Sequence, residues 1–425
     1  MKVDLKNKTQ SPAFSVKQIL ALVAVLSMFC GFLFGRAFLS MGMLLFGMTA
    51  LWGHSPKTWW RQKYWLLGCA WVLMYGLSFF WSDNVSEWQT RFQVKLPVLL
   101  LPLSFALLPA FSKKQIEIFT LIVNVLLLGG LLYSLSFFLS NYTEMMEGYG
   151  KAKVVKTPVY GDHIRFSLAI ALTVIWNIFY AFSQKFPLWK QVLLGFFTVA
   201  FVIGIHLLAV RTGLLTLYIG LMMMLLPAYK KWGRRKVLFG LATLAVTFFF
   251  LIKEVPSIQQ KINYTIYSFK QFAEHPTSIN YSDIARIVSM EAGWAAFKSQ
   301  PFFGVGAGDL VGFCRTYYQE LNIDYPNAKS LLPHNQILVV MGSAGLFGTL
   351  IFLYWLVFPL LKIKGRSRSM LVSAYALMLI FALLFEPMLE VQFGVFVFVF
   401  FMGWAMHYCR SLTEIDRDKV PFRHD

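Results

Sequence analysis

Long apolar runs separated by short polar turns dominate this sequence. The runs are continuously apolar over roughly 20 residues, the length at which a helix crosses a bilayer core, and they lack the alternation of a membrane-spanning strand. We therefore predict an all-α polytopic membrane protein, a single integral membrane domain over residues 1–425. Twelve spans are expected, at 17–34, 37–52, 64–81, 93–111, 115–140, 163–183, 188–208, 212–229, 237–253, 334–361, 370–385 and 388–409.

Two divisions between spans rest on little sequence. The turn at 208–212 is short, and merging the spans beside it would reverse the orientation of every later loop. The last two spans could also form a kinked hairpin at Glu386-Pro387.

The long polar interval 254–333, between the ninth and tenth spans, is expected to contain short helices. Apolar residues recur at helical spacing over 257–272, at Ile258, Ile262, Ile266 and Phe269. This pattern predicts an amphipathic helix that lies on the membrane surface. A second helix is expected to start near Ser282 or Asp283, either of which can cap free amides, and to end before Pro301.

Composition and charge set the orientation. The chain is 57% hydrophobic and 14% charged, whereas soluble domains carry about 25% charged residues. Its net charge of +19 would suggest nucleic acid in a soluble protein, but here a positive-inside bias explains it without such a partner. Basic residues are the only charged ones in the loops 53–63, 112–115, 183–190, 230–236 and 362–368.

The loops on the other side, including 81–92, 141–161 and 254–333, carry mixed charges. The bias therefore predicts that both termini are cytoplasmic and that 254–333 is a periplasmic loop. The polar lead before the first span lacks a small-residue cleavage site, so we expect a retained helix. The four cysteines are scattered and indicate neither a disulfide framework nor a metal site; they are Cys30, Cys69, Cys314 and Cys409.

Two arginines are expected at outward ends of spans. Arg165 lies about one turn inside the sixth span, where a charge is costly and indicates a functional site. The alternative is a local ion pair with Asp162, which helical spacing allows, and His163 stands next to this aspartate. Arg211 lies between the seventh and eighth spans, where it either extends to headgroups or binds an anion through its planar guanidinium.

The interval 254–333 adds a third arginine and a glycine-rich turn. Arg286 either binds an anion or lies on a solvated helix face with Asp283 as its partner. Glycines at 304, 306 and 308 form either a plain turn or a tight loop whose amides face an anion; Gly306 is the central one.

His334 opens an apolar span directly after Pro333. A helix N-terminus disfavours positive charge, so the imidazole should stay neutral and able to accept a proton. Asn335 can orient either the ring or a substrate; the plainer alternative is a capping or interfacial histidine. Three arginines and a neutral histidine on the outward face predict an enzyme that binds a lipid-linked diphosphate and activates a hydroxyl.

Three stretches carry a family resemblance. They are AVRTGLLTLYIG, the spacing of Arg286 and Trp294 followed by PFFGVGAGD, and PHNQILVVMGSAGLFG. Together they resemble the O-antigen ligase and polymerase superfamily of bacterial membrane glycosyltransferases. Its ligase members transfer a glycan from undecaprenyl diphosphate to a sugar hydroxyl of lipid A-core, on the periplasmic side of the inner membrane, without metal, nucleotide or other cofactor.

The resemblance implies roles for individual residues. His334 matches the ligase histidine, and Arg286 and Arg165 match arginines that bind the donor diphosphate. Arg211 matches an arginine whose role is structural or diphosphate-contacting. The expected supporting residues are Asn335, Asp162, His163 and Gly306. In the implied mechanism His334 accepts or orients the acceptor's hydroxyl proton, and one displacement inverts the anomeric carbon.

Other functions remain open. A polymerase of the superfamily would use another lipid-linked glycan as acceptor, and a protein O-oligosaccharyltransferase would modify Ser or Thr. A transporter of a small anion or lipid would place ionisable groups deep in several spans, whereas the charges here gather at one interface. Glu386 and Glu390 are expected near the outer face, where they could line the route of the acceptor.

Overall fold

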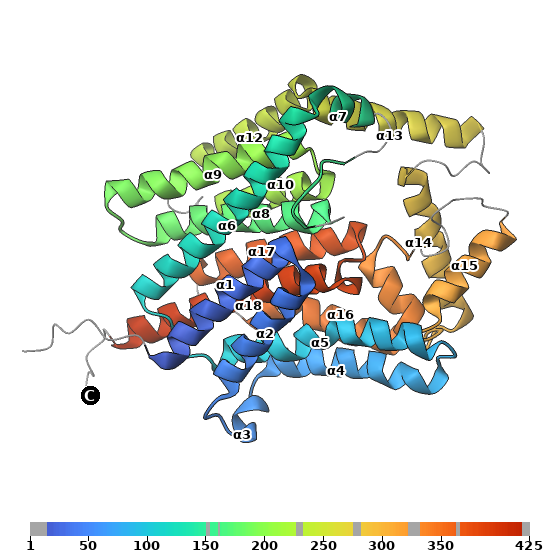
Figure 1. The fold of residues 1–425 in the computed structure, drawn as a ribbon, viewed down its shortest axis with the longest axis horizontal. Helices are drawn as coiled ribbons and strands as arrows, with labels where there is room; N and C mark the ends of the chain where they lie inside the picture. The colour runs from blue at the N-terminus through green and yellow to red at the C-terminus, as the bar shows by residue number, and fades with distance from the viewer. Residues whose placement is uncertain are drawn as a thin grey trace, which may run out of the picture.

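The computed structural model describes residues 15–149, 154–159, 162–226, 233–274, 282–321, 332–362 and 366–418. These residues form helices joined by short connections, with no β-strand among them (Figure 1), so the all-α prediction is confirmed. The helices of the first half are α1 (Val16–Phe34), α2 (Arg36–Leu51), α3 (Pro56–Trp59), α4 (Lys63–Leu77), α5 (Val85–Leu107), α6 (Lys113–Ser140), α7 (Tyr142–Tyr149) and α8 (His163–Ser183).

The second half continues the same pattern. Its helices are α9 (Leu188–Leu208), α10 (Arg211–Leu225), α12 (Arg234–Glu254), α13 (Pro256–Glu274), α14 (Ser282–Ser299), α15 (Leu310–Glu320), α16 (Gln336–Lys362), α17 (Arg366–Phe385) and α18 (Gln392–Asp418). The described residues also form two short 3₁₀ helices, η1 (Ser78–Trp81) after α4 and η4 (Met388–Glu390) between α17 and α18.

Eight helices in the described part of the chain are long and apolar enough to cross a membrane: α1, α4 with η1, α5, α6, α8, α9, α16 and α18. The helices α2, α10 and α17 are apolar but shorter, and α12 and α13 form a pair bent by 77°. The chain is therefore a multi-pass helical membrane protein. Each predicted span falls on an apolar helix, but the count of twelve stays a prediction.

Both uncertain divisions are resolved as separate helices. The chain leaves α9 through Ala209, whose φ of 49° is left-handed, and enters α10 two residues later. Between α17 and α18 the chain breaks at Glu386-Pro387 and passes through η4. Because the break leaves a short non-helical connection, Glu386 and Glu390 project from it rather than from a continuous helix.

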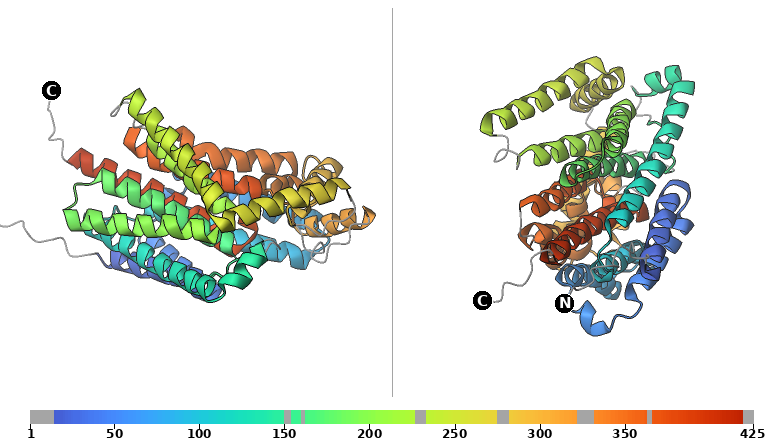
Figure 2. Two further views of the ribbon diagram at one scale, coloured as in Figure 1. Left: turned by 90° about the horizontal axis from the view of Figure 1, so that it is seen from above. Right: turned by 90° about the vertical axis from the view of Figure 1, so that its left-hand side faces the viewer.

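The centre of the bundle is built from α8 and α18 (Figure 2). In the apolar stretches of α8 and α18, 78% and 89% of the residues are buried, so protein surrounds these two helices on nearly all sides. Trp404 of α18 stacks on Phe119 of α6 with ring centroids 3.5 Å apart. Asn124 of α6 and Asn177 of α8 exchange side-chain hydrogen bonds of 2.9 and 2.7 Å, which satisfies two amides that would otherwise be costly to bury.

The polar interval docks onto a break in α16. At Gly345 the backbone adopts φ 61° and ψ −161°, and a Cβ there would lie 2.3 Å from the Phe302 carbonyl oxygen, so only glycine fits. The amide freed at Leu346 donates to the Pro301 carbonyl at 2.8 Å, and Val305 donates to the Gly342 carbonyl at 2.8 Å. These bonds fix the segment after α14 against the membrane helices.

Both helices predicted in the polar interval are present. The helix α13 leaves Ile262, Ile266 and Phe269 at least about a third exposed, as expected for a helix whose apolar face meets lipid. The helix α14 begins at Ser282 and ends at Ser299. A small apolar core joins α14, α15 and the start of α16 through residues such as Ile284, Ala292 and Val339. In Figure 1, α14 and α15 lie at one side of the molecule, opposite the end of α18.

Candidate active site

His334 is held in the turn that precedes α16. Its backbone amide donates to Ser289 Oγ of α14 at 3.0 Å. The next residue, Asn335, caps the helix, because its side-chain oxygen accepts from the amides of Ile337 and Leu338 at 2.8 and 3.1 Å. The Asn335 amide nitrogen also donates to the Leu384 carbonyl at 3.1 Å. The histidine is thus tied to α14, α16 and α17 at once.

The imidazole of His334 is oriented by Ser289. The Ser289 hydroxyl donates to the Arg286 carbonyl at 2.6 Å, and its oxygen lies 3.3 Å from His334 Nδ1. Because that hydroxyl hydrogen is already engaged, the oxygen can accept from Nδ1 in the tautomer that carries its proton there, and this tautomer leaves a lone pair on Nε2.

The charge state of His334 follows from its surroundings. Burial lowers the pKa of the ring, the nearby Arg286 and Arg165 lower it further, and the Leu332 carbonyl raises it, with a result of about 4. The ring is therefore neutral at pH 7. This agrees with the neutral imidazole expected at a helix N-terminus, although burial and the two arginines are the larger causes here.

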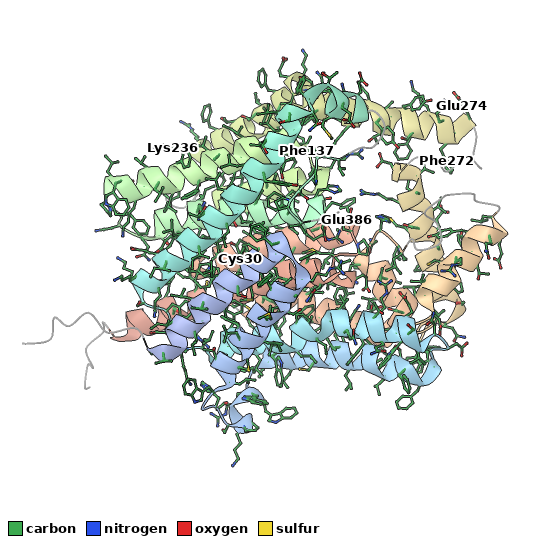
Figure 3. The ribbon with its side chains drawn as sticks, viewed as in Figure 1. Cys30, Phe137, Lys236, Phe272, Glu274 and Glu386 are labelled. Carbon is green, nitrogen blue, oxygen red and sulfur yellow. The ribbon has the colours of Figure 1, made fainter. Side chains whose placement is uncertain are left out.

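Arg286 pairs with Glu386, a partner that lies 100 residues later in the chain. Arg286 Nη2 lies 3.0 Å from Glu386 Oε1, and the arginine side chain is 33% exposed whereas the carboxylate is 5% exposed. That oxygen has no hydrogen-bond partner in the described part of the chain. Burial raises the pKa of Glu386 more than Arg286 and Arg165 lower it. Glu386 lies at the end of the bundle that faces α14 (Figure 3).

Arg165 forms the local ion pair that its spacing allowed. Its Nη1 lies 3.1 Å from Asp162 Oδ1, and Asp162 also accepts from the Arg165 amide at 3.4 Å as the cap of α8. Arg165 Nη2 reaches the Pro387 carbonyl at 3.5 Å, next to Glu386. His163, the first residue of α8, lies close to both Arg165 and Arg286. Arg165, Arg286, His163, Asp162 and His334 therefore gather at one place.

Arg211 is engaged elsewhere. Its guanidinium contacts both carboxylate oxygens of Asp283 at 2.9 Å and the Lys261 carbonyl at 3.4 Å. Asp283, which one of the two alternatives made the partner of Arg286, pairs with Arg211 instead. Through these contacts Arg211 links the start of α10 to the start of α14 and to Lys261 in α13. No contact among the described residues joins Arg211 to His334.

The turn around Gly306 packs against the connection between α4 and α5. Gly306 has φ 101° and packs against Ser82. The amides of Ala307 and Gly308 donate to Ser78 and Ser82 at 3.2 Å each. These bonds dock the turn on the α4–α5 connection and favour a plain turn at Ala307 and Gly308, whereas support of the site by Gly306 stays a prediction.

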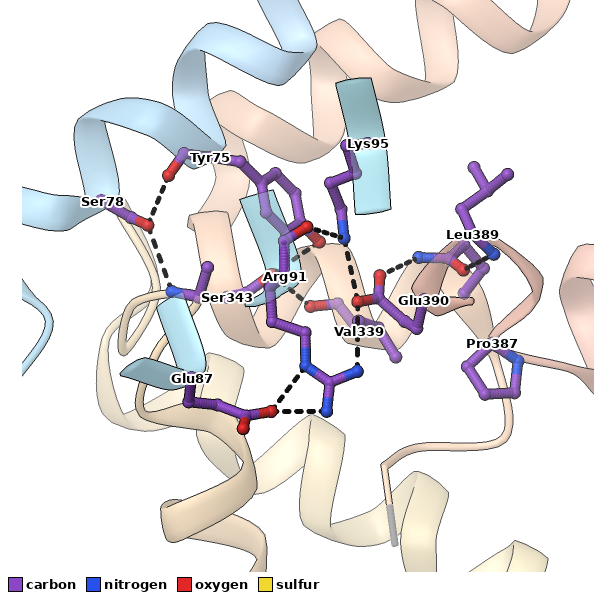
Figure 4. A network of polar contacts seen from close by, with 12 residues as sticks. Tyr75, Ser78, Glu87, Arg91, Lys95, Val339, Ser343, Pro387, Leu389 and Glu390 are labelled. Carbon is purple, nitrogen blue, oxygen red and sulfur yellow. Dashed lines mark hydrogen bonds and ion pairs between the residues drawn. The ribbon is translucent and has the colours of Figure 1, made fainter. Parts of the chain in front are cut away.

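A buried network around Glu390 lies beside the site and was not expected from sequence. Glu390 Oε2 accepts from Lys95 at 2.9 Å, Glu390 Oε1 accepts from Gln336 at 2.9 Å, and Arg91 lies 3.8 Å away (Figure 4). Lys95 also lies 4.2 Å from the centroid of the Tyr75 ring. Burial raises the pKa of Glu390, but Lys95 and Arg91 outweigh it and hold that pKa below its usual range.

Sequence could have indicated part of this network. Lys95 is a charge within a predicted apolar span, which indicates a buried partner, but nothing local identifies Glu390 as that partner. Ser289 follows Arg286 by three residues, so the sequence indicates only that the two share one helix face. Its contact with His334 depends on how α14 packs against α16.

The cluster can bind an anion next to a base. Two guanidiniums adjoin a neutral imidazole, and the arginine of α14 is partly open to solvent. Planar guanidiniums bind the oxygens of phosphates through two parallel bonds. Among the described residues, no three His, Cys, Asp or Glu side chains gather to hold a metal ion; metal independence stays a prediction.

Comparison with known proteins supports the resemblance. The family model described as O-antigen ligase matches residues 196–353, a segment that contains Arg211, Arg286 and His334 but not Arg165 or Glu386. None of the curated proteins compared with the chain matches it. The match over residues 196–353 thus supports a relationship of this part of the chain to the O-antigen ligase family.

Proposed function

We propose that this protein is an O-antigen ligase, which transfers a glycan from undecaprenyl diphosphate to a sugar hydroxyl of lipid A-core. The family supports a membrane glycosyltransferase of the ligase and polymerase type. The observation that carries the proposal further is the cluster of Arg286, Arg165 and a neutral His334. It combines cations suited to a diphosphate with a group that can accept a hydroxyl proton.

The donor diphosphate would bind between Arg286 and Arg165. Before the donor binds, Arg286 is paired with Glu386 at 3.0 Å and Arg165 is paired with Asp162 at 3.1 Å. The diphosphate brings two negative charges and forms charge-assisted hydrogen bonds with the guanidiniums. Its charge grows as the glycosidic bond breaks, so the arginines stabilise the transition state more than the bound donor.

Binding of the donor would also prepare the base. Part of the fall in the pKa of His334 comes from Arg286 and Arg165. Two phosphate charges beside these arginines offset that effect, so the imidazole becomes more basic once the donor is present. A general base works best when its pKa lies near the working pH, and this coupling would favour proton transfer only in the loaded site.

The chemical step is a single displacement. The acceptor hydroxyl oxygen forms a bond to the anomeric carbon, and the bond from that carbon to the phosphate oxygen breaks. The hydroxyl proton passes to Nε2 of His334, and undecaprenyl diphosphate leaves with the electron pair. The anomeric carbon is inverted, and no metal or cofactor is invoked. Asn335 holds His334 in place, and Asp162 and His163 support Arg165.

We also propose a periplasmic site with both termini in the cytoplasm. Basic residues stand where α4, α6 and α12 begin, at Lys63, Lys113 and Arg234, whereas His334 precedes α16, which ends at Lys362. We call the end of the bundle that carries Lys63, Lys113, Arg234 and Lys362 the basic end. It lies opposite to the site at His334. The positive-inside rule assigns it to the cytoplasm of the inner membrane, which makes 254–333 the periplasmic loop of a twelve-span topology.

The identity of the acceptor distinguishes a ligase from a polymerase and from a protein glycosyltransferase. We would incubate purified protein with undecaprenyl-diphosphate glycan and, in parallel, lipid A-core, a second lipid-linked glycan or a Ser- and Thr-containing peptide. Mass analysis identifies which acceptor carries the sugar. The proposal predicts glycosylated lipid A-core; longer chains on undecaprenyl diphosphate would indicate a polymerase, and modified peptide a protein glycosyltransferase.

A further inference from the structure

A cavity of about 370 Å³ lies at the basic end, away from the candidate active site. It is formed by residues from the start of α4, the end of α5, the end of α16 and the last part of α18. Four cationic residues line it, Arg61, Lys63, Lys362 and Arg410, and none of its lining residues is acidic. The proposed reaction uses none of them.

Its walls are apolar below this basic rim. Trp65, Phe105, Phe358 and Met406 contribute to them, so the cavity presents cations beside an apolar surface. Basic pockets between transmembrane helices on the cytoplasmic side are suited to lipid headgroups. A free anion would use the cations but leave the apolar walls without a partner.

An independent observation comes from His407, which lines the same cavity. Its side chain is 2% exposed, and its Nε2 has no hydrogen-bond partner in the described part of the chain. Its Nδ1 lies 2.9 Å from the Phe105 carbonyl and 3.1 Å from Arg410 Nη2. A buried polar atom without a partner is costly, and a hydroxyl group could satisfy it in either tautomer.

Arg410 is fixed rather than extended into solvent. Its guanidinium donates to the carbonyls of Ala106 and Leu108 at the end of α5. The cation is therefore held at a set position beside His407, whereas Arg61, Lys63 and Lys362 are exposed and can close over a bound phosphate.

We propose that this cavity binds one anionic glycerophospholipid from the leaflet at the basic end. Arg61, Lys63, Lys362 and Arg410 would hold the phosphate, His407 would meet a headgroup hydroxyl, and the acyl chains would follow the apolar wall. Phosphatidylglycerol has this combination of phosphate and hydroxyls. The inference does not depend on the glycosyl transfer reaction.

The test compares two variants with equal loss of charge. Arg61→Gln/Lys63→Gln/Lys362→Gln removes three exposed cations from the cavity. Arg234→Gln/Arg235→Gln/Lys236→Gln removes three exposed cations from the start of α12, at the same end but outside the cavity. Native mass spectrometry would count phosphatidylglycerol and phosphatidylcholine retained by each full-length protein.

The wild type is expected to retain one phosphatidylglycerol in preference to phosphatidylcholine. Each cation near a membrane surface contributes about a fivefold preference for anionic lipid, so the cavity variant should lose the preference by on the order of 100-fold, while the α12 variant keeps it. Equal losses in both variants would show diffuse surface charge and overturn the proposal. Displacement of the lipid by inorganic phosphate alone would assign the cavity to a free anion and would also overturn it.

Discussion

Glu386 and Glu390 stand four residues apart in the connection between α17 and α18, yet they meet opposite environments. Glu390 accepts from Lys95 and Gln336 at 2.9 Å each, and its pKa lies below the usual range because these partners and Arg91 outweigh burial. Glu386 has one ion pair, with a partly exposed arginine. Burial dominates there and holds its pKa above the usual range.

The difference separates a structural carboxylate from an exchangeable one. Both oxygens of Glu390 are bonded to groups from α5 and α16, so removing the carboxylate would leave Lys95 buried without its partner, which is strongly destabilising. Glu386 has one ion pair, with Arg286, and its Oε1 accepts no hydrogen bond from the described residues. Arg286 in turn lies near His334. We infer that Glu390 fixes the start of α16, and that Glu386 holds Arg286 until the donor takes its place.

The largest effect is expected at His334, which lies between Arg286, the partner of Glu386, and Gln336, the partner of Glu390. His334→Ala should lower transfer by about 10²- to 10⁴-fold, the usual contribution of a general base, without unfolding the protein. The measurement is product formation by the reconstituted variant, with His54→Ala at the basic end as the matched histidine control. Full activity in His334→Ala would remove the histidine from the mechanism.

Glu390→Ala tests whether the Glu390 carboxylate stabilises the fold. Loss of a buried ion-pair partner costs about 3–5 kcal/mol, so the variant should unfold at markedly lower temperature or denaturant concentration. Lys95→Met/Glu390→Leu removes both charges and should recover much of that loss. A single variant as stable as the wild type would show that the network does not anchor the connection.

Glu386→Gln tests the exchangeable carboxylate through the pH dependence of donor binding. As pH falls, Glu386 gains a proton and stops competing for Arg286, so the donor should bind more tightly, by up to about tenfold per pH unit. The measurement is donor Kd between about pH 5.5 and 8, above the pKa of about 4 that His334 has before the donor binds. Glu386→Gln should give a shallower profile than the wild type, because only the rise in the His334 pKa on donor binding then remains.

The other charged and titratable groups near Glu386 are Arg286, Arg165, Asp162 and His163. Glu117→Gln, which removes a carboxylate 2.7 Å from Lys190 at the basic end, is the control and should keep the wild-type slope. An unchanged slope in Glu386→Gln would assign the proton to another group.

The smallest effect is expected at Arg211. Its pair with Asp283 involves a side chain that is 42% exposed, and exposed pairs contribute about 0–1 kcal/mol. Arg211→Ala should therefore change donor Kd by less than about fivefold, measured by the same binding assay. A loss comparable to that of Arg286→Ala would place Arg211 in the diphosphate site after all.

Local patterns predicted the helices and allowed one ion pair. Continuous apolar runs indicated where α1, α6 or α9 cross the membrane, because helix length and bilayer thickness are linked. The three-residue spacing of Asp162 and Arg165 allowed an ion pair as the alternative to an anion site, and this pair is present at 3.1 Å. The periodicity of residues 257–272 likewise predicted α13.

Long-range partners could not be predicted in the same way. Arg286 and Glu386 meet because α14 docks beside the end of α17, and no sequence period records that arrangement. The break in α16 was also missed: the run MGSAGLFG contains three glycines, and only Gly345 has positive φ among them. Which glycine breaks the helix depends on the Pro301-Phe302 segment that packs there.

The most direct test of the diphosphate site is donor affinity in Arg286→Ala. Glu386→Gln serves as the background, so that an unpaired carboxylate does not itself repel the donor. Loss of charge-assisted hydrogen bonds worth about 1.5–3 kcal/mol predicts binding of an undecaprenyl-diphosphate glycan that is weaker by roughly 10- to 100-fold, with Arg234→Ala in the same background as control. Unchanged affinity in Arg286→Ala would contradict the site.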